Sequence, residues 1–378
     1  MDKIWLKQYP KGVPAEIDPG AFNSIAHVLE QSCARFADKP AYSSLGRTLS
    51  YAELDRLTRQ FASFLQHTLG LKKGERVAVM MPNLLQYPVA IFGILRAGLV
   101  VVNVNPLYTP RELEHQLKDS GAKAIVIVEN FIETLEKVID NTPLAAVITT
   151  QIGDLLPFPR RTLLNFMLKH VKQVVPKWKI PGTIDFRGAL AKGAQQAHTR
   201  VELNHQDVAF LQYTGGTTGV SKGATLLHGN IVANLQQSSG WVGTLTEDGK
   251  EIVITALPLY HIFALTANCL VFMKIGALNI LITNPRDMPN FVKELKGQPW
   301  SVITGVNTLF NALLNHPDFA KLDFSSVRLA VGGGMAVQKA VAERWKQVTG
   351  TTLIEGYGLT ETAPAATANP LDLAEYSG

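Results

Sequence analysis

The sequence has little cysteine: Cys33 and Cys269 are the only two among 378 residues. Two widely separated cysteines argue against a disulfide framework and against a cysteine-ligated zinc site. The first five residues also lack the apolar core of a signal peptide, which predicts a cytoplasmic protein. The sequence shows no repeat at a fixed period and no low-complexity tract, so nothing indicates a solenoid or a disordered chain.

A long uninterrupted hydrophobic run is also missing. Residues 252–273 contain no Asp, Glu, Lys or Arg, and the stretch is long enough to cross a bilayer. Pro258 divides it, however, and Tyr260, His261 and Asn268 interrupt it. We therefore expect a buried strand followed by a buried helix here.

The composition that is present fits a globular protein with anionic ligands. Hydrophobic residues make up 46% of the chain, which is enough for a sizeable core. The net charge is +5 and the pI is about 9.0. This mild excess of positive charge suits anionic small molecules but does not single out nucleic acid, and no nucleic-acid partner is expected.

Short apolar runs alternate with helix-forming segments along most of the chain, a pattern typical of α/β proteins. The fold class predicted is α/β, with two doubly wound, largely parallel sheets and flanking helices. Ser50 with Glu53, and Thr109 with Glu112, have the spacing of capping boxes that begin helices. Strands are expected at 76–81, 99–104, 124–128, 145–149, 208–213, 252–257, 277–282, 301–304, 327–331 and 352–354. Helices are expected at 22–36, 51–69, 84–97, 110–120, 131–140, 230–237, 263–275, 289–295, 308–315 and 337–349.

The alternation stops near Thr150, where a basic segment begins. Residues 159–200 contain nine Lys or Arg and one acid, Asp185, with apolar residues interleaved at helical spacing. One interpretation is a solvated helix and linker packed on the domain; the other is a surface that contacts anionic lipid. The chain is thus divided into residues 1–200, with a basic insert near 155–200, and residues 201–378.

The most distinctive stretch is Tyr213–Gly223, which reads YTGGTTGVSKG. A predicted strand leads into it, and its glycines, hydroxyl groups and lysine suit a polyphosphate. A Walker A loop would need Gly before the lysine and Ser or Thr after it; Lys222 has Ser221 and Gly223 instead. Residues 332–337 likewise lack the third glycine of a dinucleotide-binding fingerprint.

A serine hydrolase is a further alternative. Residues 219–223 formally match the G-x-S-x-G pattern around Ser221, and Asp287 and His316 follow in the chain order of such hydrolases. A nucleophile elbow requires the serine at a strand end with a helix directly after it. Here the next predicted helix begins only at about Asn230, so this alternative is disfavoured.

The stretch Tyr213–Gly223 resembles the signature of the adenylate-forming (AMP-binding) superfamily. Leu257–Phe263 (LPLYHIF) resembles the acyl-site motif of that family, and Gly356–Thr362 (GYGLTET) resembles its second nucleotide motif. Over nearly its whole length the chain resembles bacterial long-chain fatty acid–CoA ligases, most clearly at Met80–Pro88 and Asn103–Glu112.

The resemblance implies ATP-dependent activation of a long-chain fatty acid to an acyl-adenylate, followed by thioester formation with coenzyme A. It implies catalytic roles for Lys222, His261, Thr360 and Glu361, and it makes Glu361 the ligand of Mg²⁺. The nucleotide-binding residues it implies are Tyr213, Thr214, Gly215, Gly216, Thr217, Thr218, Gly219, Gly332, Gly333, Gly334, Gly356, Tyr357 and Gly358.

Family members are longer than this chain, and their C-terminal lid motifs do not occur in it. We therefore expect a fragment that is weakly active or inactive alone. Three alternatives stay open: a non-catalytic nucleotide- or acyl-binding fragment, a ligase for medium-chain or aryl acids, and a homodimer rather than a monomer. The expected location is the cytoplasm, with peripheral contact at the inner face of the membrane as one option.

Overall fold

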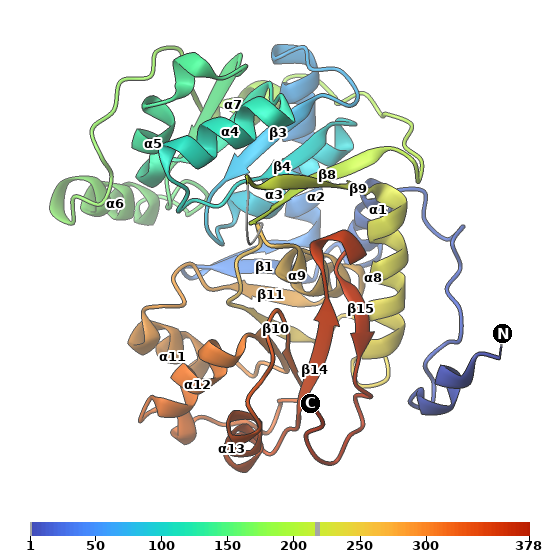
Figure 1. Ribbon diagram of the computed structural model, residues 1–378. Coiled ribbons are helices and arrows are strands. Elements are labelled where there is room, and N and C mark those ends of the chain that lie inside the picture. Colours follow the sequence, from blue (N-terminus) through green and yellow to red (C-terminus); the bar gives the residue numbers. More distant parts are fainter. Residues whose placement is uncertain (1, 216–219) are drawn as a thin grey trace.

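The computed structural model describes residues 2–215 and 220–378. Two β-sheets lie one above the other, each covered by helices (Figure 1). The helices are α1 Ile25–Arg35, α2 Tyr51–Ser63, α3 Gln86–Arg96, α4 Pro110–Ser120, α5 Ile132–Glu136, α6 Arg160–Phe166, α7 Phe186–Gly193, α8 His228–Val242, α9 Ile262–Ala264, α10 Val271–Lys274, α11 Met288–Lys296, α12 Asn307–Asn315 and α13 Lys339–Thr349. Short helical turns are η1 Ile4–Gln8, η2 Phe64–Thr68, η3 Glu129–Phe131, η4 Ile139–Asn141, η5 Met167–Val171, η6 Leu265–Leu270, η7 Phe319–Lys321 and η8 Thr360–Thr362.

Each sheet is mainly parallel and ends in an antiparallel pair. The strands are β1 Pro40–Ser44, β2 Arg47–Ser50, β3 Arg76–Met80, β4 Val100–Asn103, β5 Ala124–Val128, β6 Ala146–Thr150, β7 Ile184–Asp185, β8 Val208–Thr214, β9 Lys222–Leu227, β10 Ile252–Thr255, β11 Leu278–Leu281, β12 Val302–Gly305, β13 Leu329–Gly332, β14 Leu353–Gly358 and β15 Ala365–Ala368. The seven-stranded sheet has the order β7-β6-β5-β3-β4-β8-β9, and the eight-stranded sheet has the order β15-β14-β13-β12-β10-β11-β1-β2. Only the pairs β8–β9, β1–β2 and β14–β15 are antiparallel in the described residues. The predicted α/β class with two largely parallel sheets is confirmed.

Local sequence signals explain where several helices begin and end. The predicted capping boxes are present: Ser50 with Glu53 starts α2, and Thr109 with Glu112 starts α4. Gly121 ends α4 in the left-handed conformation, with φ of 60°, which glycine adopts without a steric penalty. Residues 252–273 form β10 and the helical run α9–η6–α10, as expected. No helix in the described part of the chain is long and apolar enough to span a bilayer.

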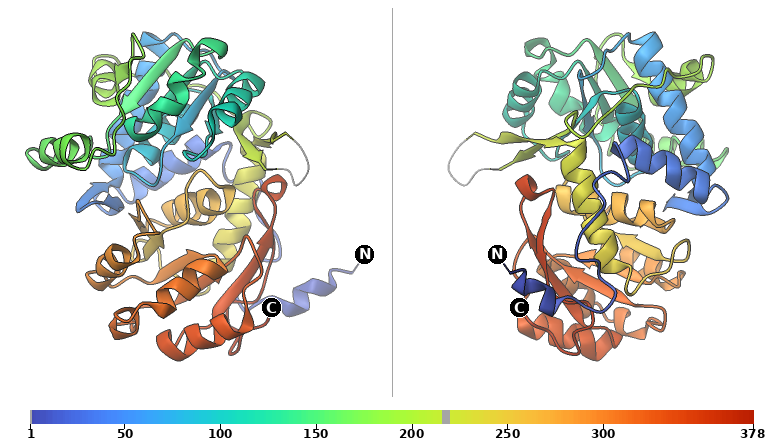
Figure 2. Two further views of the ribbon diagram at one scale, coloured as in Figure 1. Left: turned by 60° about the vertical axis from the view of Figure 1, so that its left-hand side comes forward. Right: turned by 90° about the vertical axis from the view of Figure 1, so that its right-hand side faces the viewer.

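Each sheet contains strands from both halves of the sequence. Strands β1 and β2 belong to the eight-stranded sheet, and β8 and β9 belong to the seven-stranded sheet. The boundary expected between residues 200 and 201 therefore does not separate the two sheets. Residues 9–24 run along the outside of α8 (Figure 2). The Tyr9 and Trp241 rings meet edge to face there, at 4.9 Å between centroids.

The basic segment differs from the expectation that the alternation stops near Thr150. Strand β7 pairs in parallel with β6, and α7 packs against α2 with Phe61 and Phe186 in contact. The sheet thus continues into this segment, and only α6 and η5 lie outside it. The sequence pattern missed β7 because the strand has just two residues, Ile184 and Asp185.

Four further strands and one broken helix were also unexpected. Strands β1 and β2 form an antiparallel pair before α2, where no strand was expected. Strand β9 follows the glycine-rich stretch directly, so the chain returns as an antiparallel hairpin rather than continuing as a loop to Asn230. Strand β15 follows the second nucleotide motif and pairs with β14. The helix expected at 131–140 is divided into η3, α5 and η4.

Candidate nucleotide and acyl site

The glycine-rich stretch begins on β8 and ends on β9. Thr214 and Lys222 are opposite each other in this antiparallel pair, and the Lys222 side chain is exposed. Gly215 follows β8, and a side chain there would have no neighbour within 4 Å among the described residues. The predicted residues Gly216, Thr217, Thr218 and Gly219 lie outside the described residues.

The Tyr213 side chain packs against α4. It is 8% exposed, and its hydroxyl donates a hydrogen bond to Asp119 Oδ2 at 2.6 Å. Burial, together with the neighbouring Asp119, raises the pKa of this phenol. Gly223 lies against the ring, where a Cβ atom would come within 2.9 Å of it. The Tyr213 ring therefore holds the hairpin to α4 and is directed away from a ligand placed at its tip.

The three predicted motifs of the eight-stranded sheet meet at Gly333. Its N–H donates to the Gly305 carbonyl at 3.1 Å. A Cβ atom at this position would lie 3.1 Å from the Gly356 carbonyl oxygen and 3.1 Å from the Phe263 ring. Gly332 ends β13, and Gly334 has a φ of 77° that favours glycine. Gly332 and Gly333 are therefore packed without side chains between the acyl motif and the second nucleotide motif, and only Gly334 is exposed.

The second nucleotide motif lies on the β14–β15 hairpin. Tyr357 is 62% exposed, so its ring is free to contact a planar ligand. Gly358 permits a close approach, because a Cβ atom there would be 1.9 Å from the Pro364 carbonyl oxygen. Thr360 and Glu361 follow in η8, which contacts β9. The turn that joins β14 and β15 accordingly reaches the hairpin of β8 and β9 in the other sheet, called the phosphate hairpin below for its predicted ligand (Figure 1).

His261 stands at the start of α9, in the loop that follows β10. Its ring lies 4.7 Å from the Tyr260 ring and is accessible to solvent. Surrounding protein atoms nevertheless desolvate it and lower its pKa, as expected for an accessible group in a recess. The neutral ring can donate one hydrogen bond to a carboxylate at neutral pH.

A set of buried amide and phenol groups, which sequence reasoning missed, supports this loop. Asn83 donates to the carbonyls of Thr255 and Leu257, both at 2.9 Å, and accepts from the Leu259 N–H at 2.9 Å. Gln212 on β8 donates to the Tyr260 carbonyl. Asn83 lies in one of the segments that resemble the ligase family, but an amide side chain alone carries no chemical signature.

The surroundings of Glu361 suit a metal ligand. Its carboxylate is exposed beside the phosphate hairpin. No group of three His, Cys, Asp or Glu residues lies together within 2–215 and 220–378. One carboxylate is what Mg²⁺ uses when nucleotide phosphates and water supply its other ligands, so the residues fit that ion.

The geometry of a serine hydrolase is absent around Ser221. The residue precedes strand β9 rather than a helix, and its carbonyl accepts a hydrogen bond from His115 Nε2 at 2.9 Å. Asp287 instead accepts the Asn290 N–H at the start of α11, and His316 Nδ1 accepts the Asp318 N–H. Neither of the proposed triad partners is directed at Ser221, which removes the basis for this alternative.

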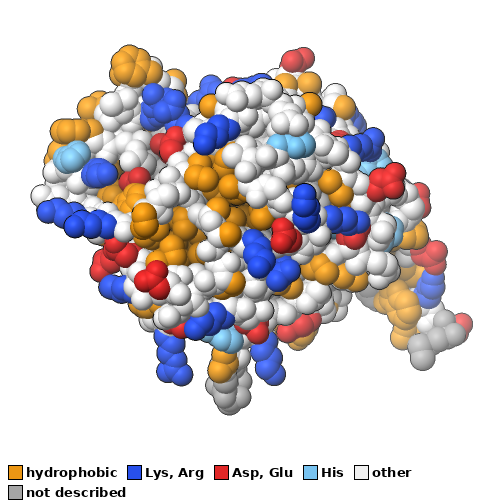
Figure 3. Space-filling view, turned by 90° about the horizontal axis from the view of Figure 1, so that it is seen from above, with side chains coloured by type: hydrophobic (Ala, Val, Ile, Leu, Met, Phe, Trp, Pro, Cys, Tyr) orange, Lys and Arg blue, Asp and Glu red, His pale blue; other side chains and the backbone are white. Residues whose placement is uncertain are grey.

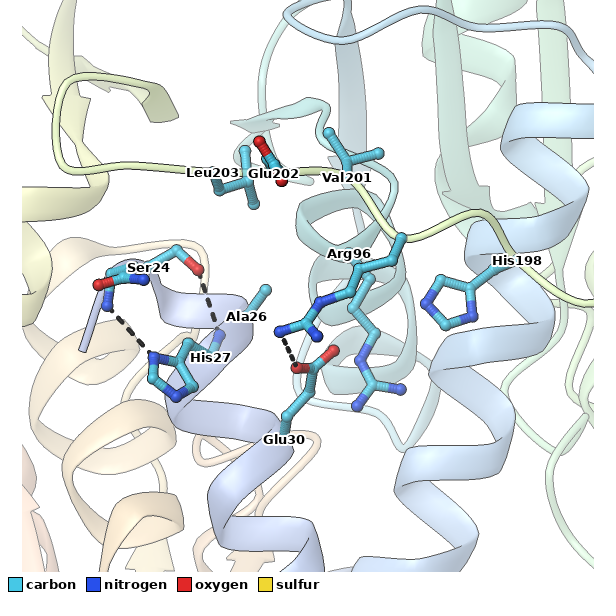
Figure 4. Close-up of a pocket in the computed structure, with 11 residues that line it drawn as sticks. Ser24, Ala26, His27, Glu30, Arg96, His198, Val201, Glu202 and Leu203 are labelled. Carbon is cyan, nitrogen blue, oxygen red and sulfur yellow. Dashed lines mark hydrogen bonds and ion pairs between the residues drawn. The ribbon is translucent and has the colours of Figure 1, made fainter.

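A cavity of about 590 Å³ lies elsewhere, between α1, the end of α3 and residues 198–203 (Figure 4). None of the predicted site residues lines it. Both of its arginines already have carboxylate partners: Arg96 binds Asp55 at 2.5 Å, and Arg200 lies 3.7 Å from Glu30. This cavity is therefore separate from the candidate site.

Comparison with known proteins decides the family. The model of the family described as AMP-binding enzyme matches residues 29–378. The chain belongs to the AMP-binding enzyme family. A long-chain-fatty-acid–CoA ligase from Escherichia coli O157:H7 is 59% identical over the whole chain, and one from Haemophilus influenzae is 53% identical. The chain spans 67% and 68% of the lengths of these AMP-binding enzymes.

Solved AMP-binding enzymes have the same fold. An anthranilate CoA ligase in complex with anthranoyl-AMP superposes with a TM-score of 0.81 at 21% identity, covering 94% of this chain and 64% of its own. A long-chain-fatty-acid-CoA ligase from Archaeoglobus fulgidus gives a TM-score of 0.78 at 22% identity, covering 96% of this chain and 69% of its own. The predicted resemblance and the predicted N-terminal architecture of such enzymes are confirmed.

Proposed function

We propose that this chain forms the fatty acid- and ATP-binding portion of a long-chain-fatty-acid–CoA ligase. The reaction joins the fatty acid carboxylate to the α-phosphate of ATP with loss of pyrophosphate, and coenzyme A thiol then displaces AMP. The single observation that carries the proposal is that η8 meets β9 while Gly333 lies between Phe263 and Gly356. Motifs from distant parts of the sequence thus meet at one place, and relatives with the same activity match the whole chain.

Each motif has a role that suits its geometry. The backbone N–H groups and hydroxyl groups beyond Thr214 would bind the β- and γ-phosphates, with Lys222 adding charge beside the departing pyrophosphate. The exposed Tyr357 ring would stack on adenine. Thr360 would donate to the α-phosphate, and His261 would donate to the fatty acid carboxylate. The protein needs no covalent intermediate, since its task is to align two anions and neutralise the charge between them.

Glu361 would hold Mg²⁺ at the phosphates. When bound, this ion would offset the negative charge of the phosphates. The exposed carboxylate beside β9 supports the assignment, and its position leaves the metal open to phosphate oxygens and water.

Pyrophosphate release with ATP and oleate tests the proposal, measured on this chain and on a chain extended to the length of its relatives. We expect oleate-dependent release from the extended chain and weak or no release from the shorter one. ATP binding without release in both would favour the non-catalytic alternative. Oleate, octanoate and benzoate are compared in the same assay, and a preference for either shorter or aromatic acid would favour the other substrate classes.

We also propose peripheral contact with anionic membranes through α6 and η5. No residue of these two elements is buried. Large apolar side chains stand out from them and from the adjoining residues: Phe158 is 76% exposed, Leu163 and Val171 are 68% exposed, and Phe166 is 57% exposed. Seen from above, hydrophobic side chains and Lys or Arg side chains are intermixed at the end of the molecule where Figure 1 places α6 (Figure 3).

The energetics favour a lipid surface as the partner of this α6 surface. Each large apolar side chain gains roughly 1.5–3 kcal/mol when it is fully buried, and each Lys or Arg near an anionic bilayer adds about 1 kcal/mol. A helix with both groups and no buried residue is typical of interfacial binding. Such contact would bring the enzyme to a source of fatty acid.

Vesicle flotation tests this contact, using phosphatidylcholine vesicles with and without phosphatidylserine. We expect binding to the anionic vesicles, weakened at high salt and abolished in the double variant Leu163→Ser, Phe166→Ser. The matched control, Ile4→Ser with Trp5→Ser, removes apolar groups that are 69% and 48% exposed on η1 and should bind as the original chain does. Equal binding by the two double variants would contradict the proposal.

A further inference from the structure

A buried chain of polar side chains joins the phosphate strand β8 to the loop that carries His261. Gln212 donates to the Tyr260 carbonyl, and Asn103 Nδ2 donates to Gln212 Oε1 at 3.0 Å. The Tyr87 hydroxyl lies 2.8 Å from Asn103 Oδ1 and 2.7 Å from the Leu259 carbonyl oxygen. All three residues are at most 3% exposed. We call Tyr87, Asn103 and Gln212 the amide network.

The amide network crosses from one sheet to the other. Gln212 lies on β8 of the seven-stranded sheet, two residues before Thr214. Tyr260 lies in the loop between β10, in the eight-stranded sheet, and α9. Because Tyr260 directly precedes His261, the Gln212 side chain fixes the loop with His261 relative to the strand that leads into the phosphate hairpin.

We infer that Gln212 is a positioning residue that sets the fatty acid carboxylate against the α-phosphate of ATP. The inference rests on the proposed function, since it takes the carboxylate to lie at His261 and the phosphates beyond Thr214. Gln212 touches neither substrate; it acts through the Tyr260 carbonyl. The end of β8 is the element that both sites share: it leads into the stretch that binds the phosphates in the proposed function, and the Gln212 amide carries its position to the loop with His261.

The physical basis is that buried amides have few alternatives. In Gln212→Met the side chain keeps its length but becomes apolar, so the Tyr260 carbonyl and the Asn103 amide lose their partner. Unpaired buried groups favour any shift that reaches water or another partner. The loop with His261 is then free to move relative to β8, so binding of one substrate no longer raises the affinity for the other.

The test measures how strongly one substrate promotes binding of the other. Calorimetry gives the affinity of this chain for laurate, below its micelle concentration, with and without Mg²⁺ and α,β-methylene ATP. The ratio of the two dissociation constants is the coupling factor, which must be the same from either substrate. We expect a factor of about fivefold or more in the original chain and a factor near one in Gln212→Met.

Gln86→Met is the matched control. Gln86 is also buried and donates to the Gln151 carbonyl at 2.7 Å, but its hydrogen bonds join α3 to the end of β6 and the loop after it, not to residues 257–261. A merely structural loss would lower the melting temperature of both variants. Only the Gln212 variant should lose coupling, and equal coupling in the two variants would overturn the inference.

The outcomes separate the inference from the function on which it rests. If the original chain binds neither substrate, the proposed function fails. If it binds both with a coupling factor of one, the positioning role of Gln212 fails and the function stands. Should Gln212→Met not fold, Tyr87→Phe removes one hydroxyl from the same network; we expect a reduced factor, and an unchanged factor would contradict the inference.

Discussion

A methyl group at position 358 should push apart the strands β14 and β15, whose connecting turn carries Thr360 and Glu361. In Gly358→Ala the new Cβ atom would lie 1.9 Å from the Pro364 carbonyl oxygen, a backbone atom. An ordinary contact of this kind needs about 3.5 Å, so β14 and β15 must move apart by roughly 1.5 Å. The hydrogen bond from the Leu359 N–H to that same oxygen, now 3.1 Å, would be lost.

The cost can be worked out from these contacts. Overpacking costs about 1–3 kcal/mol, and the lost hydrogen bond costs about 1 kcal/mol, which gives a total of about 2–4 kcal/mol. The hairpin can avoid part of this cost by opening locally, which displaces η8 from β9. We therefore expect a modest fall in melting temperature and a loss of at least about tenfold in Mg²⁺–ATP affinity, equivalent to about 1.4 kcal/mol.

Thermal unfolding and ATP calorimetry check this prediction together. Gly297→Ala is the matched control, because a Cβ atom there has no neighbour within 4 Å and the residue has a φ of −90°. It should leave both quantities unchanged. ATP affinity in Gly358→Ala equal to that of the control would refute the assignment of the β14–β15 hairpin to the nucleotide site.

Three further predictions concern single side chains. Tyr357→Ala should lower ATP affinity by about tenfold, since aromatic stacking on a base contributes about 1–3 kcal/mol. The affinity for GTP should fall equally, and the melting temperature should stay constant. An unchanged ATP affinity in calorimetry would contradict the stacking role. Glu361→Gln should weaken ATP binding only when Mg²⁺ is present, and an equal loss with EDTA would exclude a metal role. Burial lowers the pKa of His228 to about 4. Below about pH 6.5 this side chain therefore binds a proton in the unfolded chain but not in the folded chain. The free energy of unfolding should fall by up to about 3 kcal/mol between pH 6.5 and 4. Urea titrations should show a flatter pH profile in His228→Gln, and identical profiles would contradict this origin.

Much of the fold follows from local sequence signals. The capping boxes at Ser50 and Thr109 predict the starts of α2 and α4 correctly. The apolar runs predict most of the parallel strands, but not β1 and β7. The presence of strands from both halves of the sequence in each sheet could not be predicted, because β1 pairs with β11, more than 200 residues away, and local pattern carries no information on such pairing. The antiparallel strands β9 and β15 were missed because glycine, alanine and threonine dominate them and no alternation of apolar and polar residues marks them.

The candidate site also combines features that local sequence indicates with features that depend on long-range packing. Its chemistry stays a prediction from the sequence, in which glycines, hydroxyl groups, a lysine and a glutamate in three motifs indicate a polyphosphate and a metal. The proximity of Phe263, Gly333 and Gly356 was not predictable, because it depends on the parallel packing of β12, β13 and β14. Nor did the sequence distinguish the inward Tyr213, bonded to Asp119, from the exposed Tyr357; the direction of a side chain depends on which face of the sheet is covered.

The central claim is that motifs from both sheets form one site for ATP and a fatty acid. Its most direct test is calorimetric titration of this chain with a non-hydrolysable lauroyl-adenosine sulfamate, which joins both substrates in one molecule and needs no turnover. The account predicts one site per chain, an affinity at least about a hundredfold above that of laurate alone, and competition by both ATP and laurate. Binding that only ATP displaces, or no binding by the folded chain, would contradict it.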